Sequence, residues 1–247
     1  MNLDFSLILT CTIDPKDMPD LVRSNKETRL NDYKKSFNFW INNSYIKKII
    51  FIENSSFDLT YFKNLAKNFK DKEIEIMSSN SNNTFDKKLG KGYGQHLSLK
   101  EIFESSNIAK KTEYFVDVGA RYCVKNLNAI INDMHKSQTD IYINITDNLK
   151  FADANIYGGT KKFFEEYLVP ETGKTNDSIN KIYENWVANA VLKAVSDGMI
   201  LSKTPIYADI DGYIGTNGKK YSQNIFKKIK LFFFRKLKTY FFQHKKY

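Results

Sequence analysis

The chain has 247 residues, of which 42% are hydrophobic and 27% charged. This composition is ordinary for a globular protein that buries a sizeable core. No run of about 18 apolar residues occurs, so we expect no membrane-spanning helix. The formal net charge is +10, but residues 225–247 carry eight Lys and Arg and no acid. The remaining 30 basic residues (38 minus 8) nearly balance 28 acidic ones, so no nucleic acid is expected as a partner of the body.

The N-terminal segment 3–13 reads as a buried strand and not as a signal peptide, because it is short, lacks a basic leader and contains Asp4. The two cysteines, Cys11 and Cys123, have no metal-ligand spacing. A reduced, cytoplasmic protein is the simplest inference from their number and positions.

Strands and helices are predicted to alternate through the first 145 residues. The predicted strands are short apolar runs, at 5–13, 46–53, 73–78, 114–118 and 140–145. Between them lie helix-like stretches. The first has Ser24 and Glu27 at capping-box spacing and an apolar stripe formed by Tyr33, Phe37 and Trp40. This rhythm predicts an α/β fold with a mostly parallel sheet flanked by helices.

The rhythm breaks after Asp147. A glycine pair is followed by a short helix, and a long helix is predicted over 176–198, with a buried stripe that includes Ile179, Trp186 and Val187. Residues 205–221 are rich in turn residues and read as a loop or edge strand. We expect one domain over residues 1–221, followed by a basic tail over 222–247.

Polar residues follow the predicted strands, where ligands of parallel α/β sheets bind. The candidates at the first two strand ends are Thr10, Thr12, Asp14, Glu53 and Asn54. Loops also carry polar residues simply because they are solvated, so this pattern is supportive only.

The stretch GKGYGQ places three glycines at alternate positions before a helix-like segment. Such a cluster lets a backbone approach a phosphate, but it also serves in an ordinary turn. Its residues Gly90, Lys91, Gly92, Tyr93 and Gly94 are candidates for phosphate binding.

Asp117 ends the predicted strand in "YFVDVGAR". It fits a divalent-metal ligand beside a diphosphate, although the second aspartate of an Asp-x-Asp pair is Gly119 here. The same run resembles the cofactor turn of S-adenosylmethionine-dependent methyltransferases. An aspartate that caps the next helix is an equally good interpretation.

Glu184 lies two residues before Trp186 on the long helix, so it points away from the buried stripe. A carboxylate there could act as a general base, or it could simply be solvated. The chain has four arginines against 34 lysines. Arg23, Arg29 and Arg121 are candidate phosphate ligands because a guanidinium matches phosphate oxygens, and surface ion pairs are the alternative for each.

The tail over 222–247 has an aromatic and aliphatic stripe with lysines mostly opposite. This pattern favours a helix on an anionic membrane surface. A helix docked on the body by its apolar face, or an RNA-binding segment, is the alternative.

Several stretches together resemble small bacterial GT-A-type glycosyltransferases of lipopolysaccharide and capsule biosynthesis. They are "TCTIDP", "RLNDYKKSFNFW", "IIFIENSSFDL", "GKGYGQ", "GARYCVKN", "KKFFEEYLVP" and "YENWVANAV". The sequence departs from that pattern at Asp117, where a basic residue is usual, and at Asn185, where a histidine is usual.

The resemblance implies transfer of a sugar from a nucleotide-sugar donor to a hydroxyl of a surface glycan or lipid-linked acceptor. Glu184 would be the base, and Asp117 with Arg121 would meet the diphosphate, with Mn²⁺ or Mg²⁺ as an uncertain cofactor. The enzyme would be peripheral on the inner face of the cytoplasmic membrane. A methyltransferase, or a non-enzymatic membrane adaptor, is the alternative.

Overall fold

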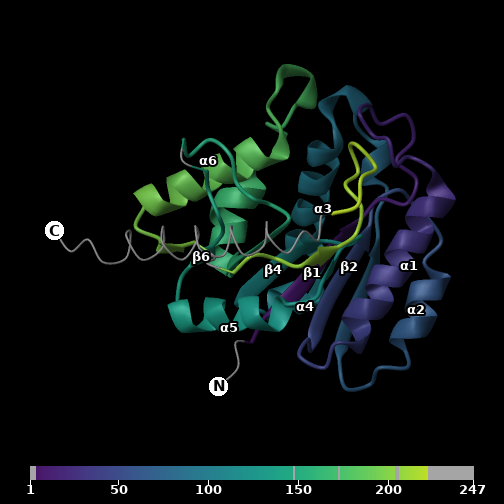
Figure 1. Ribbon diagram of the computed structural model, residues 1–247, viewed down its shortest axis with the longest axis horizontal. Helices are drawn as coiled ribbons and strands as arrows, with labels where there is room; N and C mark the ends of the chain where they lie inside the picture. The colour runs from purple at the N-terminus through teal and green to yellow at the C-terminus, as the bar shows by residue number, and fades with distance from the viewer. Residues whose placement is uncertain (1–3, 147, 172, 204–205, 222–247) are drawn as a thin grey trace.

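The computed structural model describes residues 4–146, 148–171, 173–203 and 206–221 (Figure 1). The basic tail predicted over 222–247 lies outside the described residues. No helix in the described ranges combines the length and the hydropathy needed to cross a bilayer.

A seven-stranded sheet forms the centre of the molecule, in the order β3-β2-β1-β4-β7-β6-β8. Its strands are β1 (Ser6–Cys11), β2 (Lys48–Glu53), β3 (Glu73–Ser78), β4 (Tyr114–Gly119), β6 (Ile141–Tyr142), β7 (Ile156–Thr160) and β8 (Leu201–Ser202). Strands β3, β2, β1 and β4 are parallel, β6 and β8 are parallel, and β7 runs antiparallel to both of its neighbours. The predicted α/β fold with a mostly parallel sheet is thus confirmed.

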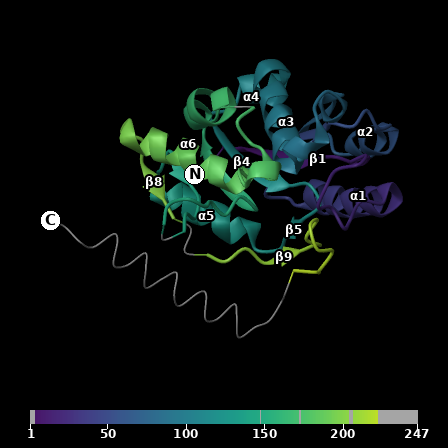
Figure 2. The same cartoon turned by 90° about the horizontal axis from the view of Figure 1, so that it is seen from above.

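Helices cover both faces of the sheet (Figures 1 and 2). One face packs against α1 (Lys26–Asn42), α2 (Thr60–Ala66) and α5 (Leu127–Ser137). The other packs against α3 (Lys91–Ser105), α4 (Asn107–Lys110), the π-helix Phe163–Leu168 and α6 (Tyr183–Ser196). Short 3₁₀ turns occur at Ser81–Asn83, Lys87–Leu89, Val169–Glu171 and Asp177–Ile179.

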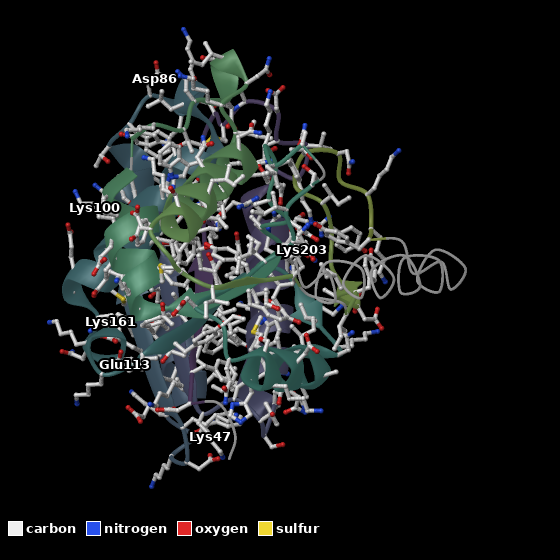
Figure 3. All side chains as sticks on the ribbon, turned by 90° about the vertical axis from the view of Figure 1, so that its left-hand side faces the viewer. Lys47, Asp86, Lys100, Glu113, Lys161 and Lys203 are labelled. Atoms are coloured by element: carbon white, nitrogen blue, oxygen red, sulfur yellow. The ribbon has the colours of Figure 1, made fainter. Side chains whose placement is uncertain are left out.

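Side-chain alternation along the strands builds the two cores. In β1, Leu7 and Leu9 face the α1 side, whereas Ile8 faces the α3 side. Successive side chains of a strand point to opposite faces of the sheet, so each strand contributes to both cores. Charged side chains cover the outside, and Lys47 and Lys100 point away from the body (Figure 3).

Three predicted elements differ from the structure. Helix α1 is capped by Asn25, whose side chain accepts the Thr28 N–H, and not by Ser24. The long helix begins at Tyr183 because Asn180, with φ of 56°, interrupts the chain before it, and Ile179 is 57% exposed. The glycine pair Gly158–Gly159 lies inside β7. A Cβ at Gly159 would lie 2.7 Å from the Phe163 ring, so close packing, and not a turn, explains this glycine.

A small second sheet extends the fold toward the C-terminal end of the described chain. It pairs β5 (Cys123–Val124) with β9 (Ile210–Asp211). Residues 206–221, which include β9 and which we call the strap, cross the molecule toward the loop after β1 (Figure 1, yellow). The Arg23 N–H donates to the Gly215 carbonyl at 3.2 Å and fixes the far end of the strap.

Candidate functional site

A cleft of about 320 Å³ opens where β1, β2 and β4 end at their carboxyl termini. Its lining comes from six parts of the chain: the strand-end loops, α1, the first turns of α3, the loop before β7, the first turn of α6, and the strap. The lining residues are Thr10, Thr12, Arg29, Tyr33, Asn54, Lys91, Gly92, Gln95, Gly119, Ala120, Arg121, Tyr122, Ala154, Asn155, Tyr183, Glu184, Ile214, Gly215, Thr216 and Tyr221.

The structure brings many of the residues selected from sequence into this cleft. Those that line it are Thr10, Thr12, Arg29, Asn54, Lys91, Gly92, Arg121 and Glu184. Those that do not line it are Asp14, Arg23, Glu53, Gly90, Tyr93, Gly94 and Asp117.

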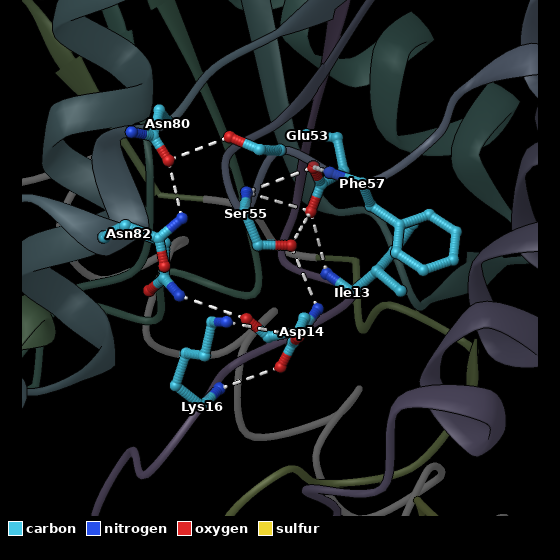
Figure 4. A network of polar contacts seen from close by, with 10 residues as sticks. Ile13, Asp14, Lys16, Glu53, Ser55, Phe57, Asn80 and Asn82 are labelled. Carbon is cyan, nitrogen blue, oxygen red and sulfur yellow. Dashed lines mark hydrogen bonds and ion pairs between the residues drawn. The ribbon is translucent and has the colours of Figure 1, made fainter.

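Glu53 joins the loops after β1 and β2 through a network of polar contacts (Figure 4), and it is not among the cleft-lining residues. Its side chain is fully buried. Its carboxylate accepts the backbone N–H groups of Ile13 at 3.0 Å, Ser55 at 3.0 Å and Phe57 at 2.9 Å. A carboxylate satisfied by several backbone donors needs no cation in the interior. We therefore interpret Glu53 as the residue that holds the loops after β1 and β2 together.

Asn54 connects those loops to α3. Its Oδ1 accepts the Thr12 hydroxyl at 2.7 Å, and its Nδ2 donates to the Gly94 carbonyl at 3.2 Å and the Ser98 hydroxyl at 3.0 Å. The side chain is 2% exposed. Asn54 thus fixes the spacing between the β1 loop and the start of α3, which form two walls of the cleft.

The glycine cluster lies inside the first turns of α3 and not in a loop before it. The helix begins at Lys91, with Gly90 as its N-cap at φ of 89°. A Cβ at Gly92 would fall 2.8 Å from Tyr183 Cβ, so this glycine lets α3 and α6 touch. Gly94 lies against the ring of Phe85, which Tyr93 also contacts at 4.8 Å between ring centroids.

Asp177 lies at the N-terminus of α3, where the sequence suggested a phosphate. A Cβ at Gly90 would fall 2.0 Å from its Oδ2. Burial raises the pKa of Asp177, and the nearby Glu184 raises it further, while Lys91 and its backbone N–H lower it. The helix N-terminus is therefore partly satisfied by a side chain of this protein.

Positive charge dominates the cleft lining, with Arg29, Lys91 and Arg121 against the single carboxylate of Glu184. Arg29 is 4% exposed and donates to the Thr12 carbonyl at 2.7 Å and the Tyr33 hydroxyl at 3.0 Å. Within the described ranges neither arginine of the cleft forms an ion pair, and Arg121 Nη1 is buried without a hydrogen-bond partner. An unsatisfied buried donor is costly, so this arrangement favours an anionic ligand.

Asp117 lies beneath the cleft floor. A metal ligand at this position was expected to face the cleft, and Asp117 does not. It precedes the end of β4 by two residues and shares the α3-facing side of the strand with Phe115. The carboxyl group is 1% exposed, and Oδ2 accepts the Tyr157 hydroxyl at 2.8 Å. Burial raises the pKa of Asp117 to about 7. Tyr157 and the neighbouring Gln95 lower it, although no hydrogen bond of normal geometry reaches Oδ1.

The residues present do not fit the divalent cation that the resemblance implied as an uncertain cofactor. Mg²⁺ and Mn²⁺ prefer several carboxylate or carbonyl oxygens around an open position. Asp117 is enclosed, its ionised form is disfavoured, and Glu184 is the one carboxylate among the cleft-lining residues. No group of three or more His, Cys, Asp or Glu that could hold a metal ion occurs in the described part of the chain.

The environment of Asp117 also gives no support to the methyltransferase alternative. In methyltransferases of that type, the acidic turn follows the first strand of the domain. Asp117 belongs instead to the fourth strand in chain order, and its carboxyl group faces Tyr157 in the core.

Arg23 and Asp14 have structural partners outside the cleft. Arg23 forms a bidentate ion pair with Asp32, at 2.5 and 2.7 Å, and its guanidinium lies 4.0 Å from the centroid of the Tyr213 ring. Asp14 Oδ1 accepts the backbone N–H of Lys16 at 3.2 Å. Arg23 therefore secures the strap, and Asp14 shapes its own turn.

Sequence reasoning missed the aromatic and amide half of the cleft. Tyr221 donates to Asn155 Oδ1 at 2.8 Å, and its ring meets the Tyr122 ring edge-on at 5.2 Å. The available sequence signal for Tyr122 was its position directly after Arg121, which was predicted to bind phosphate. No sequence signal pairs Asn155 with Tyr221, since 66 positions separate them.

No family model and no curated protein sequence matches this chain. Among solved structures, it is similar to a protein named as a glucose-1-phosphate thymidylyltransferase from Bacillus anthracis, with a TM-score of 0.52 and 10% identity over 85% of this chain and 89% of that one. Looser matches are a 4-diphosphocytidyl-2C-methyl-D-erythritol synthase from Anaerococcus prevotii (TM-score 0.43, 14% identity, 95% and 96% covered) and a CMP:2-keto-3-deoxy-manno-octonic acid synthetase complexed with CTP (TM-score 0.46, 7% identity, 94% and 99% covered). The chain therefore shares its α/β fold with the structure named as a thymidylyltransferase.

Proposed function

We propose that the cleft binds the diphosphate of a nucleotide sugar and that the protein transfers the sugar to a hydroxyl group of a bacterial surface glycan. The observation that carries this proposal is the pair of guanidinium groups, Arg29 and Arg121, which line the cleft without carboxylate partners in the described chain. Arginine forks match phosphate oxygens, and the loss of water in a cleft strengthens the interaction.

The cations would take over part of the charge neutralisation that a metal supplies in other phosphate sites. Arg29 approaches the cleft from α1, Arg121 from the turn after β4, and Lys91 from the start of α3. A diphosphate between them would satisfy the free donor Arg121 Nη1. The aromatic half, with Tyr122 and Tyr221, supplies ring surfaces for a base or a sugar.

Glu184 is the proposed general base. It sits in the first turn of α6 and is the one carboxylate among the cleft-lining residues. A base positioned against an acceptor hydroxyl contributes roughly 10²–10⁴-fold to the rate. We expect Glu184→Gln to lose turnover by that factor while it retains donor binding.

Nucleotidyl transfer is the second candidate, because the structure with a TM-score of 0.52 is named as a thymidylyltransferase. In that reaction a sugar 1-phosphate attacks a nucleoside triphosphate and pyrophosphate leaves. A phosphate nucleophile is already ionised at neutral pH, so this reaction does not require Glu184 as a base.

The test starts with a thermal-shift panel of UDP-glucose, GDP-mannose, TDP-glucose and CDP-glucose, with and without Mn²⁺. A ligand at 100 times its Kd stabilises the folded state by about 2.7 kcal/mol, which shifts the Tm measurably. Hits are then assayed for nucleoside diphosphate release with glycan acceptors, and in parallel for pyrophosphate release from triphosphates with sugar 1-phosphates. If no nucleotide sugar of the panel binds, the proposed function is wrong.

A further inference from the structure

We propose that Asp117 is a positioning residue that, through Tyr157, sets whether the Tyr183 hydroxyl donates or accepts a hydrogen bond toward a ligand in the cleft. Tyr183 contacts the ligand in this proposal, and Asp117 acts from beneath the floor. The inference rests on the proposed function only in requiring that a ligand occupies the cleft.

The three groups form a continuous buried chain of hydrogen bonds. Asp117 Oδ2 lies 2.8 Å from the Tyr157 hydroxyl, which lies 2.9 Å from the Tyr183 hydroxyl. Asp117 and Tyr157 are 1% and 0% exposed, and Tyr183, at 5%, lines the cleft. Neither hydroxyl has another hydrogen-bond partner among the described residues, and Tyr183 is the member of the chain that lines the cleft.

Each hydroxyl has one proton, which fixes the direction of the chain. When Asp117 is ionised, Tyr157 donates to it and Tyr183 must donate to Tyr157. Tyr183 then offers only lone pairs to the cleft. When Asp117 Oδ2 carries a proton, Asp117 donates to Tyr157 and Tyr157 donates to Tyr183. The Tyr183 O–H is then free to donate to a ligand oxygen.

The groups that face Asp117 leave both protonation states accessible. Burial raises the pKa of Asp117 to about 7, and no lysine or arginine is among the groups that shift it. Tyr157 faces it from β7 and Gln95 from α3, and its β1 neighbour in the sheet is the apolar Ile8.

The Tyr183 end of the chain has its own ionisable surroundings. Burial raises the pKa of Tyr183 far above its usual value, and Asp117 and Glu184 raise it further. The His96 ring packs edge-on against it, 5.1 Å between ring centroids. Tyr183 therefore stays protonated and can serve as either donor or acceptor.

A buried carboxyl group without a cation destabilises a fold, and a hydrophobic residue or asparagine would avoid that cost. Glu53, the other fully buried carboxylate described above, is satisfied by backbone donors, whereas no hydrogen bond of normal geometry reaches Asp117 Oδ1. A role in setting the direction of the hydrogen-bond chain explains why Asp117 is an acid, because the amide of an asparagine cannot gain or lose a proton in this pH range.

The binding experiment uses the full chain and Asp117→Asn, Tyr157→Phe and Tyr183→Phe variants, which keep the side-chain shapes. Kd is measured by calorimetry from pH 5.5 to 8.5 for the nucleoside diphosphate sugar with the largest shift in the panel above. Its phosphodiester groups do not titrate in this range. We expect the wild-type Kd to change by roughly 2- to 10-fold, the worth of one hydrogen bond, with a midpoint near pH 7, and each variant to lose that change.

A second measurement follows Asp117 without any ligand. The infrared C=O stretch of a protonated carboxyl group should titrate in the wild type and vanish in Asp117→Asn. Its midpoint should shift in both Tyr157→Phe and Tyr183→Phe if the three groups are coupled.

The outcomes separate the two proposals. A pH-dependent Kd that persists in Asp117→Asn, or an infrared midpoint that Tyr183→Phe leaves unchanged, overturns the role of Asp117. If no member of the panel binds while the infrared midpoint shifts, the proposed function fails and the coupling between Asp117 and Tyr183 stands.

Discussion

The guanidinium of Arg121 lies directly against Gly215 of the strap, so that a Cβ at Gly215 would fall 2.8 Å from Arg121 Nη2. Residues almost 100 positions apart thus meet at one wall of the cleft. The absence of a side chain at Gly215 lets the guanidinium face the cleft.

Gly215→Ala should displace the Arg121 guanidinium without unfolding the protein, because the clashing atom is the end of a flexible side chain. Loss of a charge-assisted hydrogen bond should raise the Kd for the nucleotide sugar roughly 10-fold or more. Calorimetry measures the change, and Lys219→Ala, an exposed change in the same strap, is the control. Wild-type affinity in Gly215→Ala would exclude Arg121 as a diphosphate ligand.

Gly92→Ala should destabilise the fold, because its Cβ would lie 2.8 Å from Tyr183 Cβ and 3.3 Å from the Tyr183 backbone nitrogen. Relief requires α3 and α6 to separate, and we expect a loss of about 1–3 kcal/mol in the free energy of unfolding. Gly94→Ala is the matched control, since it has the same helical setting and its nearest contact is 3.3 Å, on the Phe85 ring. Equal urea midpoints for the two variants would contradict the close contact of the helices.

The stability of the protein should fall as the pH rises from 4 to 8, through Asp117. Its folded-state pKa of about 7 lies above the unfolded-state value, so the folded protein holds the proton more tightly. The stabilisation is full below about pH 4 and is lost as the pH passes 7, which amounts to a change on the order of 4 kcal/mol. Urea unfolding of the wild type and Asp117→Asn across this range isolates the effect, because asparagine does not titrate. Parallel curves for the two proteins would show that Asp117 ionises normally.

Residues 222–247 remain the proposed membrane-binding segment. Each lysine or arginine near an anionic bilayer contributes about 1 kcal/mol, an attraction that salt screens. A truncation after Tyr221 should therefore stop pelleting with phosphatidylserine vesicles at low salt, whereas the full chain should pellet and be released as salt increases. Equal pelleting of both proteins would place the membrane contact in the body or remove it altogether.

Much of the cleft could be predicted from the sequence, because strand ends are local features. Thr12, Asn54 and Arg121 follow short apolar runs, and the carboxyl ends of parallel strands meet at one edge. The same reasoning gave the wrong position for Asp117, because successive side chains of a strand point to opposite faces of the sheet. Its strand runs on to Gly119, so the aspartate falls on the face that packs against α3 and α6.

The strap could not be predicted as part of the site. Its turn residues indicate only a loop, and its place over the cleft depends on the Arg23 N–H bond to Gly215 and on the pairing of β5 with β9. These contacts join positions far apart in the chain, and no local pattern encodes them. Arg23 was predicted to bind phosphate because of its residue type, but it forms an ion pair with Asp32, nine residues later.

The sequence by itself determined the alternation of strands and helices, the apolar runs that become two cores, and the concentration of basic residues in the tail. These depend on periodicity and composition, which act over neighbouring residues. The tertiary structure alone decided which charges lack partners, that α3 and α6 meet at Gly92, and that Asp117 faces two tyrosines in the core. Those properties depend on burial and on distances between remote segments, and they exist only after the chain has folded.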